Sequence, residues 1–246
     1  LPDHRALRVE GTFAMRNDGE GPLSSMSFTV GPAMREVRWS IDGAAVVPED
    51  RAGLHVLQPP LPLAPGAAVR VGFACESRFG DGYSRNGGGA REFVLPGGVL
   101  LDTLGRNFLP VPGFVEGIGL TRERRHEPRP WPGSFWLAEL PPVAGSRRAF
   151  HSRLEITAPA DLTVLSVGAK TAERTRAGRT TTVWESGPRP VRFLSLVAGR
   201  WSQSRFDQAA VFHHPAHGRH VDSMVSTLAA ARRRFSAWFG PYPWPE

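Results

Sequence analysis

The clearest structural signal is the run Leu7-Arg8-Val9-Glu10-Gly11-Thr12-Phe13-Ala14-Met15, in which apolar and polar side chains alternate. Leu7, Val9, Phe13 and Met15 fall on one face of the run, together with Gly11. A period of two residues is the pattern of a β-strand that buries one face. The sequence Asn17-Asp18-Gly19 follows and is typical of a tight turn. Residues 7–15 therefore predict a half-buried strand that ends in a turn.

The same alternation recurs at short intervals along most of the chain. Further predicted strands are residues 26–30, 37–41, 69–75, 154–156, 164–167, 181–184, 191–197 and 209–212. Turn signals lie between them at Asp42-Gly43, Pro65-Gly66, Gly178 and Gly187-Pro188. Short strands separated by glycine and proline turns predict a mostly β fold, a β-sandwich of short antiparallel strands.

Only the end of the chain has a helical pattern. Its apolar residues recur at three- and four-residue spacing, namely Val221, Met224, Val225, Leu228, Phe235, Trp238 and Phe239. This spacing predicts one C-terminal amphipathic helix that ends at Gly240-Pro241. The run Arg232 to Arg234 would then lie in the last turns and suit the negative end of the helix dipole.

So wide an apolar stripe on a terminal helix requires a surface to cover it. We predict an interface made by Met224, Leu228, Phe235 and Trp238. The alternative is that this helix packs on the β-sandwich of its own chain.

Composition excludes several classes of protein. The chain has 246 residues, of which 41% are hydrophobic and 22% charged, and this is the range of globular proteins. No apolar run reaches the roughly 20 residues that a membrane-spanning helix needs. Cys75 is the only cysteine, so an intramolecular disulfide is ruled out, and its place on the buried face of a strand favours a structural thiol. The net charge of +7 comes from scattered arginines without a nucleic-acid-binding motif, so we expect no nucleic-acid partner.

The middle of the chain, Phe79 to Arg147, lacks a regular pattern. It contains the glycine run Asn86-Gly87-Gly88-Gly89 and the proline-rich run at residues 127–133. We expect a long irregular segment that either carries function or covers a sheet face. The predicted organisation is a β domain at residues 1–212 that includes this segment, followed by a linker and helix at residues 213–246.

Four histidines in the linker raise the question of a metal site. In a helix His213 would lie over His217, and His217 over His220, as paired metal ligands do. No glutamate stands between them as in H-E-x-x-H, and Pro215 and Gly218 favour a loop. We therefore predict no metal in this chain, with His213, His217 and His220 as the residual candidates. No G-x-S-x-G, Walker or dinucleotide fingerprint occurs, so we assign no catalytic or cofactor-binding residue.

One ordered set of segments carries a family resemblance. It comprises Leu154-Glu155-Ile156 ending in Ala158-Pro159-Ala160-Asp161, then Val164 to Gly168, Thr180 to Trp184, Phe193 to Gly199, and Phe239-Gly240-Pro241-Tyr242-Pro243-Trp244. This order resembles the zinc aminopeptidase family of aminopeptidase N. The parts of the family that these segments resemble are the second half of its non-catalytic N-terminal β domain and the first helix of its catalytic domain. Residues 150–246 match best, and residues 1–80 match as the opening strands.

The resemblance implies a saddle-like β domain that docks on a thermolysin-like catalytic domain. In that family H-E-x-x-H and a distant glutamate bind zinc, and G-A-M-E-N holds the amino terminus of the peptide. Neither motif occurs in this sequence. The resemblance therefore implies a fragment: an accessory domain that covers the substrate cleft, inactive by itself. Its partner would be a downstream catalytic domain of the same polypeptide that carries the zinc, with peptide substrate as a further contact.

Residues Gly113 to Leu120, followed by Arg122-Glu123-Arg124-Arg125, resemble the bacterial branch of the family that is fused to a transporter permease. That branch implies membrane spans elsewhere in the parent protein and an extracytoplasmic position for this domain. The alternative to the accessory-domain hypothesis is a stand-alone β-sandwich binding module. Such a module would recognise peptide, glycan or a membrane-protein partner through residues 79–147.

Overall fold

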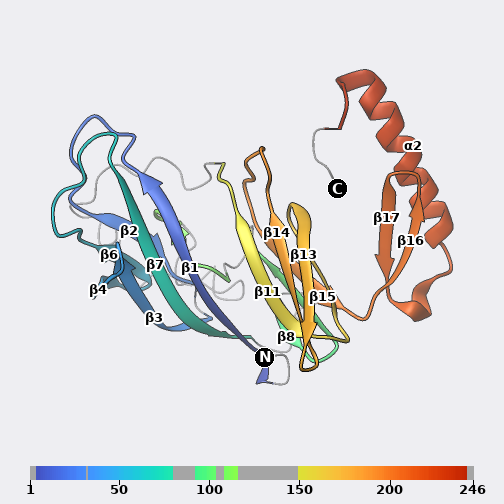
Figure 1. The fold of residues 1–246 in the computed structure, drawn as a ribbon, viewed down its shortest axis with the longest axis horizontal. Helices are drawn as coiled ribbons and strands as arrows, with labels where there is room; N and C mark the ends of the chain where they lie inside the picture. Colours follow the sequence, from blue (N-terminus) through green and yellow to red (C-terminus); the bar gives the residue numbers. More distant parts are fainter. Residues whose placement is uncertain (1–3, 32, 80–91, 104–107, 116–148, 243–246) are drawn as a thin grey trace, which may run out of the picture. The chain divides into compact units, whose positions relative to one another are not determined.

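The computed structural model describes residues 4–31, 33–79, 92–103, 108–115 and 149–242. These residues form mostly antiparallel β-strands, with one α-helix near the C-terminus (Figure 1), which confirms the predicted fold class. The chain divides into two compact units, Leu1–Val94 with Leu101–Arg148, and Leu95–Leu100 with Ala149–Glu246.

The first unit is a sandwich of two four-stranded sheets, with strand orders β1-β7-β3-β4 and β10-β2-β6-β5. The strands of the first sheet are β1 (Ala6–Arg16), β7 (Ala68–Arg78), β3 (Met34–Ile41) and β4 (Ala44–Val46). Those of the second are β10 (Val111–Pro112), β2 (Met26–Thr29), β6 (Leu54–Leu57) and β5 (Glu49–Arg51). Every strand predicted in this part of the sequence is present.

The core of this unit lies between the inward faces of the two sheets. Its buried members include Phe28, Trp39, Leu57, Val71 and Phe73, and Cys75 lies among them. Burial raises the pKa of the Cys75 thiol, which keeps it protonated and unreactive, as the structural-thiol prediction requires.

Gly11 has a packing role in the first predicted strand. It lies opposite Phe73 in the β1–β7 pairing, and a Cβ atom at Gly11 would lie 2.8 Å from Cε1 of Phe73. The missing side chain lets the Phe73 ring stack on Phe13, with the ring centres 5.1 Å apart. The glycine in the alternating run is therefore a packing requirement of the core.

The second unit contains two whole sheets and most of a third. The strand orders are β11-β14-β13, β12-β15-β9-β8, and the hairpin β16–β17. The bounds are β11 (Arg153–Pro159), β14 (Arg179–Glu185), β13 (Ala169–Arg176), β12 (Thr163–Ser166), β15 (Ser195–Gly199), β9 (Gly98–Asp102), β8 (Phe93–Leu95), β16 (Ser202–Phe206) and β17 (Ala209–His213). A short 3-10 helix, η2 (Pro215–His217), leads to the helix α2 (Val221–Phe239).

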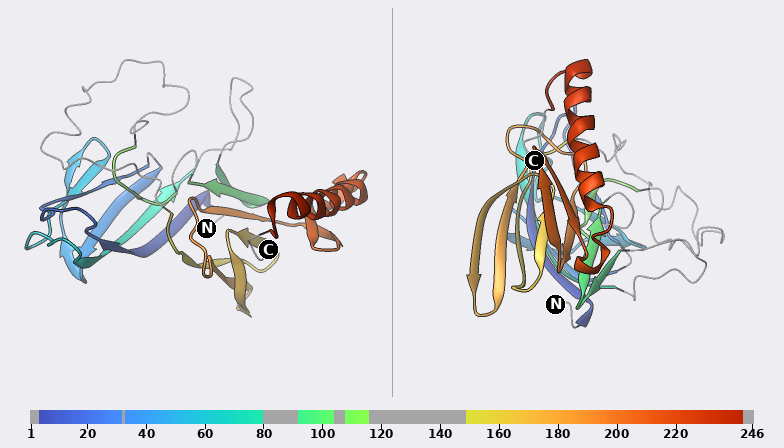
Figure 2. Two further views of the ribbon diagram at one scale, coloured as in Figure 1. Left: turned by 90° about the horizontal axis from the view of Figure 1, so that it is seen from above. Right: turned by 90° about the vertical axis from the view of Figure 1, so that its right-hand side faces the viewer.

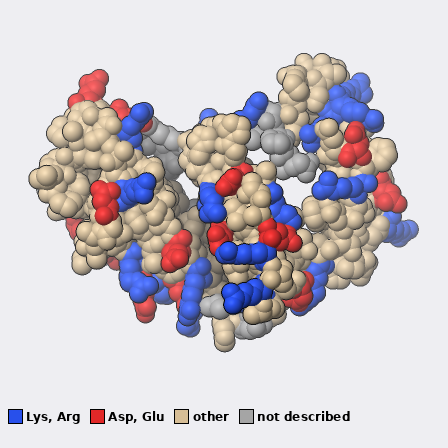
Figure 3. Space-filling model, viewed as in Figure 1, with Lys and Arg blue, Asp and Glu red and all other residues tan. Residues whose placement is uncertain are grey.

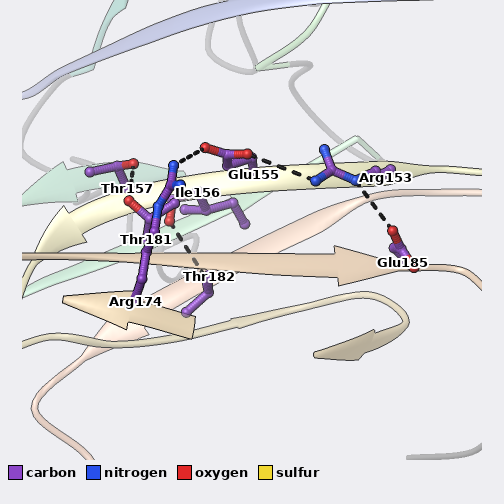
Figure 4. A network of polar contacts seen from close by, with 8 residues as sticks. All are labelled: Arg153, Glu155, Ile156, Thr157, Arg174, Thr181, Thr182 and Glu185. Atoms are coloured by element: carbon purple, nitrogen blue, oxygen red, sulfur yellow. Dashed lines mark hydrogen bonds and ion pairs between the residues drawn. The ribbon is translucent and has the colours of Figure 1, made fainter. Parts of the chain in front are cut away.

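Polar side chains cross the exposed face of the β11-β14-β13 sheet (Figure 4). Nη2 of Arg174 donates to Oε1 of Glu155 at 2.9 Å, and Nε of Arg153 lies 3.3 Å from Oε1 of Glu185. The hydroxyls of Thr157 and Thr181 lie 2.8 Å apart. The side chains of these ion pairs are between 42% and 75% exposed, so the network is a surface feature of the sheet and no enclosed site.

Three details depart from the sequence analysis. The segment expected to be irregular contains the strands β8, β9 and β10, and its residues 80–91, 104–107 and 116–147 lie outside the described residues. The strand expected at residues 191–197 begins only at Ser195. The polar strands β13 and β16 and the short strands β4, β5 and β6 were not predicted. The proposed boundary at residue 212 stays a prediction.

Candidate functional site

The helix α2 and the β16–β17 hairpin form a small helix-on-hairpin module (Figure 2). The face of α2 that packs there is made by Val221, Val225 and Ala229, which are the buried residues of the helix. Their spacing of four residues keeps them on one side of the helix. The helix ends at Gly240, where a φ of 91° favours glycine, and Pro241 follows, as predicted.

A second apolar row on α2 is exposed. Met224, Leu228, Phe235 and Trp238 have 52%, 49%, 55% and 59% of their surface in contact with solvent. Their spacings of four, seven and three residues place them along one stripe of the helix, beside the buried face. We call these four residues the docking face. They are the residues that the sequence predicted for an interface, and that role stays a prediction.

Aromatic side chains extend the docking face at its C-terminal end. The ring centres of Phe235 and Trp238 lie 6.0 Å apart, and Phe239 lies 6.2 Å from Trp238. The guanidinium of Arg234 lies over the Trp238 ring at 4.9 Å. Tyr242 adds another ring that is 53% exposed. Exposed tryptophan, tyrosine and arginine together are characteristic of residues that dominate protein interfaces.

Phe239 and Tyr242 were not among the predicted interface residues, although both are exposed. The sequence signal for them is the aromatic pair Phe239 and Tyr242 on either side of Gly240-Pro241. The helix-dipole interpretation of Arg232 to Arg234 is wrong, because no basic residue lies in the last turn of α2. Arg232 instead contacts the Tyr242 ring and the Gln208 carbonyl of the hairpin turn, and Arg234 lies over the Trp238 ring.

Of the four linker histidines, His214 and His217 are neighbours, with ring centres 5.2 Å apart. His213 ends β17, His217 belongs to η2, and His220 is the residue before α2. Nδ1 of His214 accepts a hydrogen bond from the backbone N–H of Ala216 at 3.2 Å and so caps η2. Among the described residues no group of three or more histidine, cysteine, aspartate or glutamate side chains could hold a metal ion. The structure therefore does not bring the candidates His213, His217 and His220 together as one three-ligand group.

Charge on the molecule is mixed. On the face in Figure 3 acidic and basic side chains intermingle, and basic groups also gather over α2. None of the helices in the described part of the chain has the length and apolar character needed to cross a membrane.

Comparisons with known proteins agree with this architecture. No family model and no curated protein matches the chain. Solved structures do match. One is an M1 zinc metallopeptidase from Deinococcus radiodurans, which is 21% identical, has a TM-score of 0.53, and aligns over 99% of this chain and 51% of its own. A point mutant of that enzyme bound to a Tyr-Ser-Ala substrate matches at 17% identity and TM-score 0.55, covering 99% and 52%. A two-domain M1 zinc metallopeptidase mutant bound to L-arginine matches at 18% identity and TM-score 0.58, with the same coverage.

The chain thus shares its fold with M1 zinc metallopeptidases and spans about half of their length. This agrees, at the level of the fold, with the resemblance to a zinc aminopeptidase family. The transporter-fusion branch stays a prediction.

Proposed function

We propose that this chain is the non-catalytic, β-rich accessory part of a zinc aminopeptidase, and that it shapes and covers a substrate cleft supplied by a catalytic domain. The proposal assigns zinc and the bond-breaking chemistry to that other domain of the same polypeptide. Support comes from the shared fold, which extends over about half of each M1 zinc metallopeptidase chain. The absence of H-E-x-x-H and G-A-M-E-N from this sequence fits the same division.

The single observation that carries the proposal is the docking face of α2. One side of the helix is already covered by the hairpin, through Val221, Val225 and Ala229. The row beside it keeps about half of each large apolar side chain in water. A contiguous exposed apolar surface of this kind marks an interaction site. The occupant that we propose is the catalytic domain, because it would be covalently joined close to α2.

The test uses the polypeptide extended beyond Glu246 by the sequence that follows it in the source gene. We expect that protein to bind one equivalent of zinc and to release the N-terminal residue of an aminoacyl arylamide, and to lose this activity when a chelator removes the metal. The 246-residue chain assayed beside it should be inactive. An extended protein that neither binds zinc nor cleaves the substrate would contradict the proposal.

A narrower proposal concerns the branch of the family. We propose that the parent protein is fused to a transporter permease, with this domain on the extracytoplasmic side. The support is the residue pattern at Gly113 to Arg125, most of which lies outside the described residues. Apolar runs of about 20 residues elsewhere in the parent sequence would agree with it. Their absence from the complete reading frame would refute it.

The alternative of a stand-alone binding module places its ligand on residues 79–147. Most of that segment lies outside the described residues, and no observation on the remainder favours a peptide, glycan or membrane-protein ligand there. This alternative stays a prediction.

A further inference from the structure

A concavity of about 310 Å³ lies where the turn of the β16–β17 hairpin meets the middle of α2. It belongs entirely to the second compact unit. The lining residues are Asp207 and Gln208 from the turn, and Ala229, Arg232, Arg233 and Ser236 from the helix. It is separate from the docking face, since none of the four residues of that face lines it. Two arginines and a hydroxyl thus share one small concave surface.

Arg232 is held in place from two directions. Its Nη1 donates a hydrogen bond to the carbonyl oxygen of Gln208 at 3.2 Å. Its guanidinium carbon lies 4.7 Å from the centre of the Tyr242 ring. An arginine that is already ordered loses less conformational freedom when it binds a ligand. Only part of its donor capacity is used by Gln208, because a guanidinium carries five N–H donors.

Positive charge in the concavity exceeds negative charge. In the part of the chain that the structure describes, neither Arg232 nor Arg233 forms an ion pair with an acidic side chain. Asp207 is the only acidic residue of the lining, which therefore has one net positive charge. An anion bound in the concavity would offset this excess of positive charge. The Ser236 hydroxyl, one helical turn from Arg232, offers a further donor.

We propose that this concavity binds a small oxyanion, a carboxylate or a phosphate group, through Arg232 and Arg233 with Ser236 as an additional donor. Arginine is suited to this task because its planar fork matches both kinds of oxyanion in a two-point contact. Asp207 limits the affinity by its own negative charge. The proposal does not depend on the proposed accessory role of the chain.

The experiment is calorimetric titration of the 246-residue chain with inorganic phosphate and, separately, with succinate, at constant ionic strength. Arg233→Gln should weaken binding about tenfold, because it removes charged hydrogen bonds to the anion. Arg234→Gln is the matched control: it removes the same charge from the adjacent residue, which lies over Trp238 and does not line the concavity. Asp207→Asn should tighten binding, and asparagine tolerates the positive φ of 54° at this position.

Thermal unfolding of each variant establishes that the comparison is made between folded proteins. Saturable binding of either probe that Arg233→Gln weakens, Arg234→Gln leaves unchanged and Asp207→Asn strengthens would support the site. A preference for phosphate or for succinate then assigns the kind of oxyanion. The proposal is overturned if the unmodified chain binds neither probe, or if Arg234→Gln weakens binding as much as Arg233→Gln does.

Discussion

Nε1 of Trp39 donates a hydrogen bond to Nδ1 of His55 at 2.9 Å, and this bond joins the two sheets of the first unit. Trp39 lies on β3 and His55 on β6, on opposite sides of the core. Because Nδ1 accepts, a neutral His55 carries its proton on Nε2, which lies 3.7 Å from Oδ1 of Asp50. The bond requires a neutral imidazole, since protonated histidine has no acceptor.

The first prediction is that acid weakens this link. Burial holds the pKa of His55 below its ordinary value, and the Asp50 carboxylate opposes that shift only in part. The unfolded chain therefore takes up the proton first, near pH 6.5. The contribution of His55 to the free energy of unfolding should be complete above that pH and fall as the pH decreases toward the folded-state pKa. The midpoint of thermal unfolding, measured from pH 8 to pH 5, should report this loss of stability.

His55→Gln supplies the comparison, because a glutamine oxygen can accept from the indole but does not titrate. The variant should show a shallower pH dependence than the unmodified chain. His151→Gln, at an exposed histidine, is the control and should retain the original slope. Equal slopes for all three proteins would refute the role given to His55.

The second prediction concerns Gly11. An alanine Cβ would lie 2.8 Å from Cε1 of Phe73, closer than packed atoms approach. Gly11→Ala should therefore lower the free energy of unfolding by about 1–3 kcal/mol, as overpacking of a core does. At Gly21 a Cβ would have no neighbour within 4 Å, so Gly21→Ala should stay within about 0.5 kcal/mol of the original. Urea unfolding distinguishes the two, and equal effects would contradict the packing argument.

The third prediction separates the two apolar rows of α2. Val225 is buried against the hairpin, whereas Leu228 on the docking face is 49% exposed. In the 246-residue chain Val225→Ala should cost about 2 kcal/mol through the cavity it leaves. Leu228→Ala should change the free energy of unfolding by less than about 0.5 kcal/mol, since alanine also favours the helix. A cost at Leu228 equal to that at Val225 would mean that the docking face is covered within this chain.

The fourth prediction is a small effect in the surface network of Figure 4. Glu155 contacts Arg174 at 2.9 Å and Arg153 at 3.9 Å, yet all three side chains are largely exposed. Exposed ion pairs contribute little because water and salt screen them. Glu155→Gln should leave the midpoint of thermal unfolding nearly unchanged at 0.15 M salt. A large drop would show that the network stabilises this sheet.

Most of the strands that could be predicted from the sequence have one face less exposed than the other. In β1 the alternation is complete, because every second side chain from Leu7 to Met15 turns toward the core. The strand β13 could not be found this way: almost all of its residues are exposed, so its sequence has no apolar period. It is a strand because it pairs with β14 across the Ala177-Gly178 turn. Backbone pairing of this kind does not require a particular pattern of side chains, so a polar sequence does not indicate it.

The candidate site on α2 could likewise be predicted only in part from the sequence. The three- and four-residue spacing predicted both the helix and its apolar stripe. It could not say which part of the stripe the hairpin covers, because Val225 and Leu228 are equally apolar in sequence. The contacts of Arg232 with the Gln208 carbonyl and with Tyr242 are equally invisible there, since they depend on how the hairpin turn meets the helix.

The most direct test of the central claim is hydroxyl-radical footprinting of Met224, Phe235 and Trp238, whose side chains react readily when exposed. The labelling is compared between the 246-residue chain and the polypeptide extended beyond Glu246. The account predicts strong oxidation of all three in the chain, where each is more than half exposed, and marked protection in the extended polypeptide. Equal oxidation in both proteins would contradict it, because no downstream domain would then cover α2.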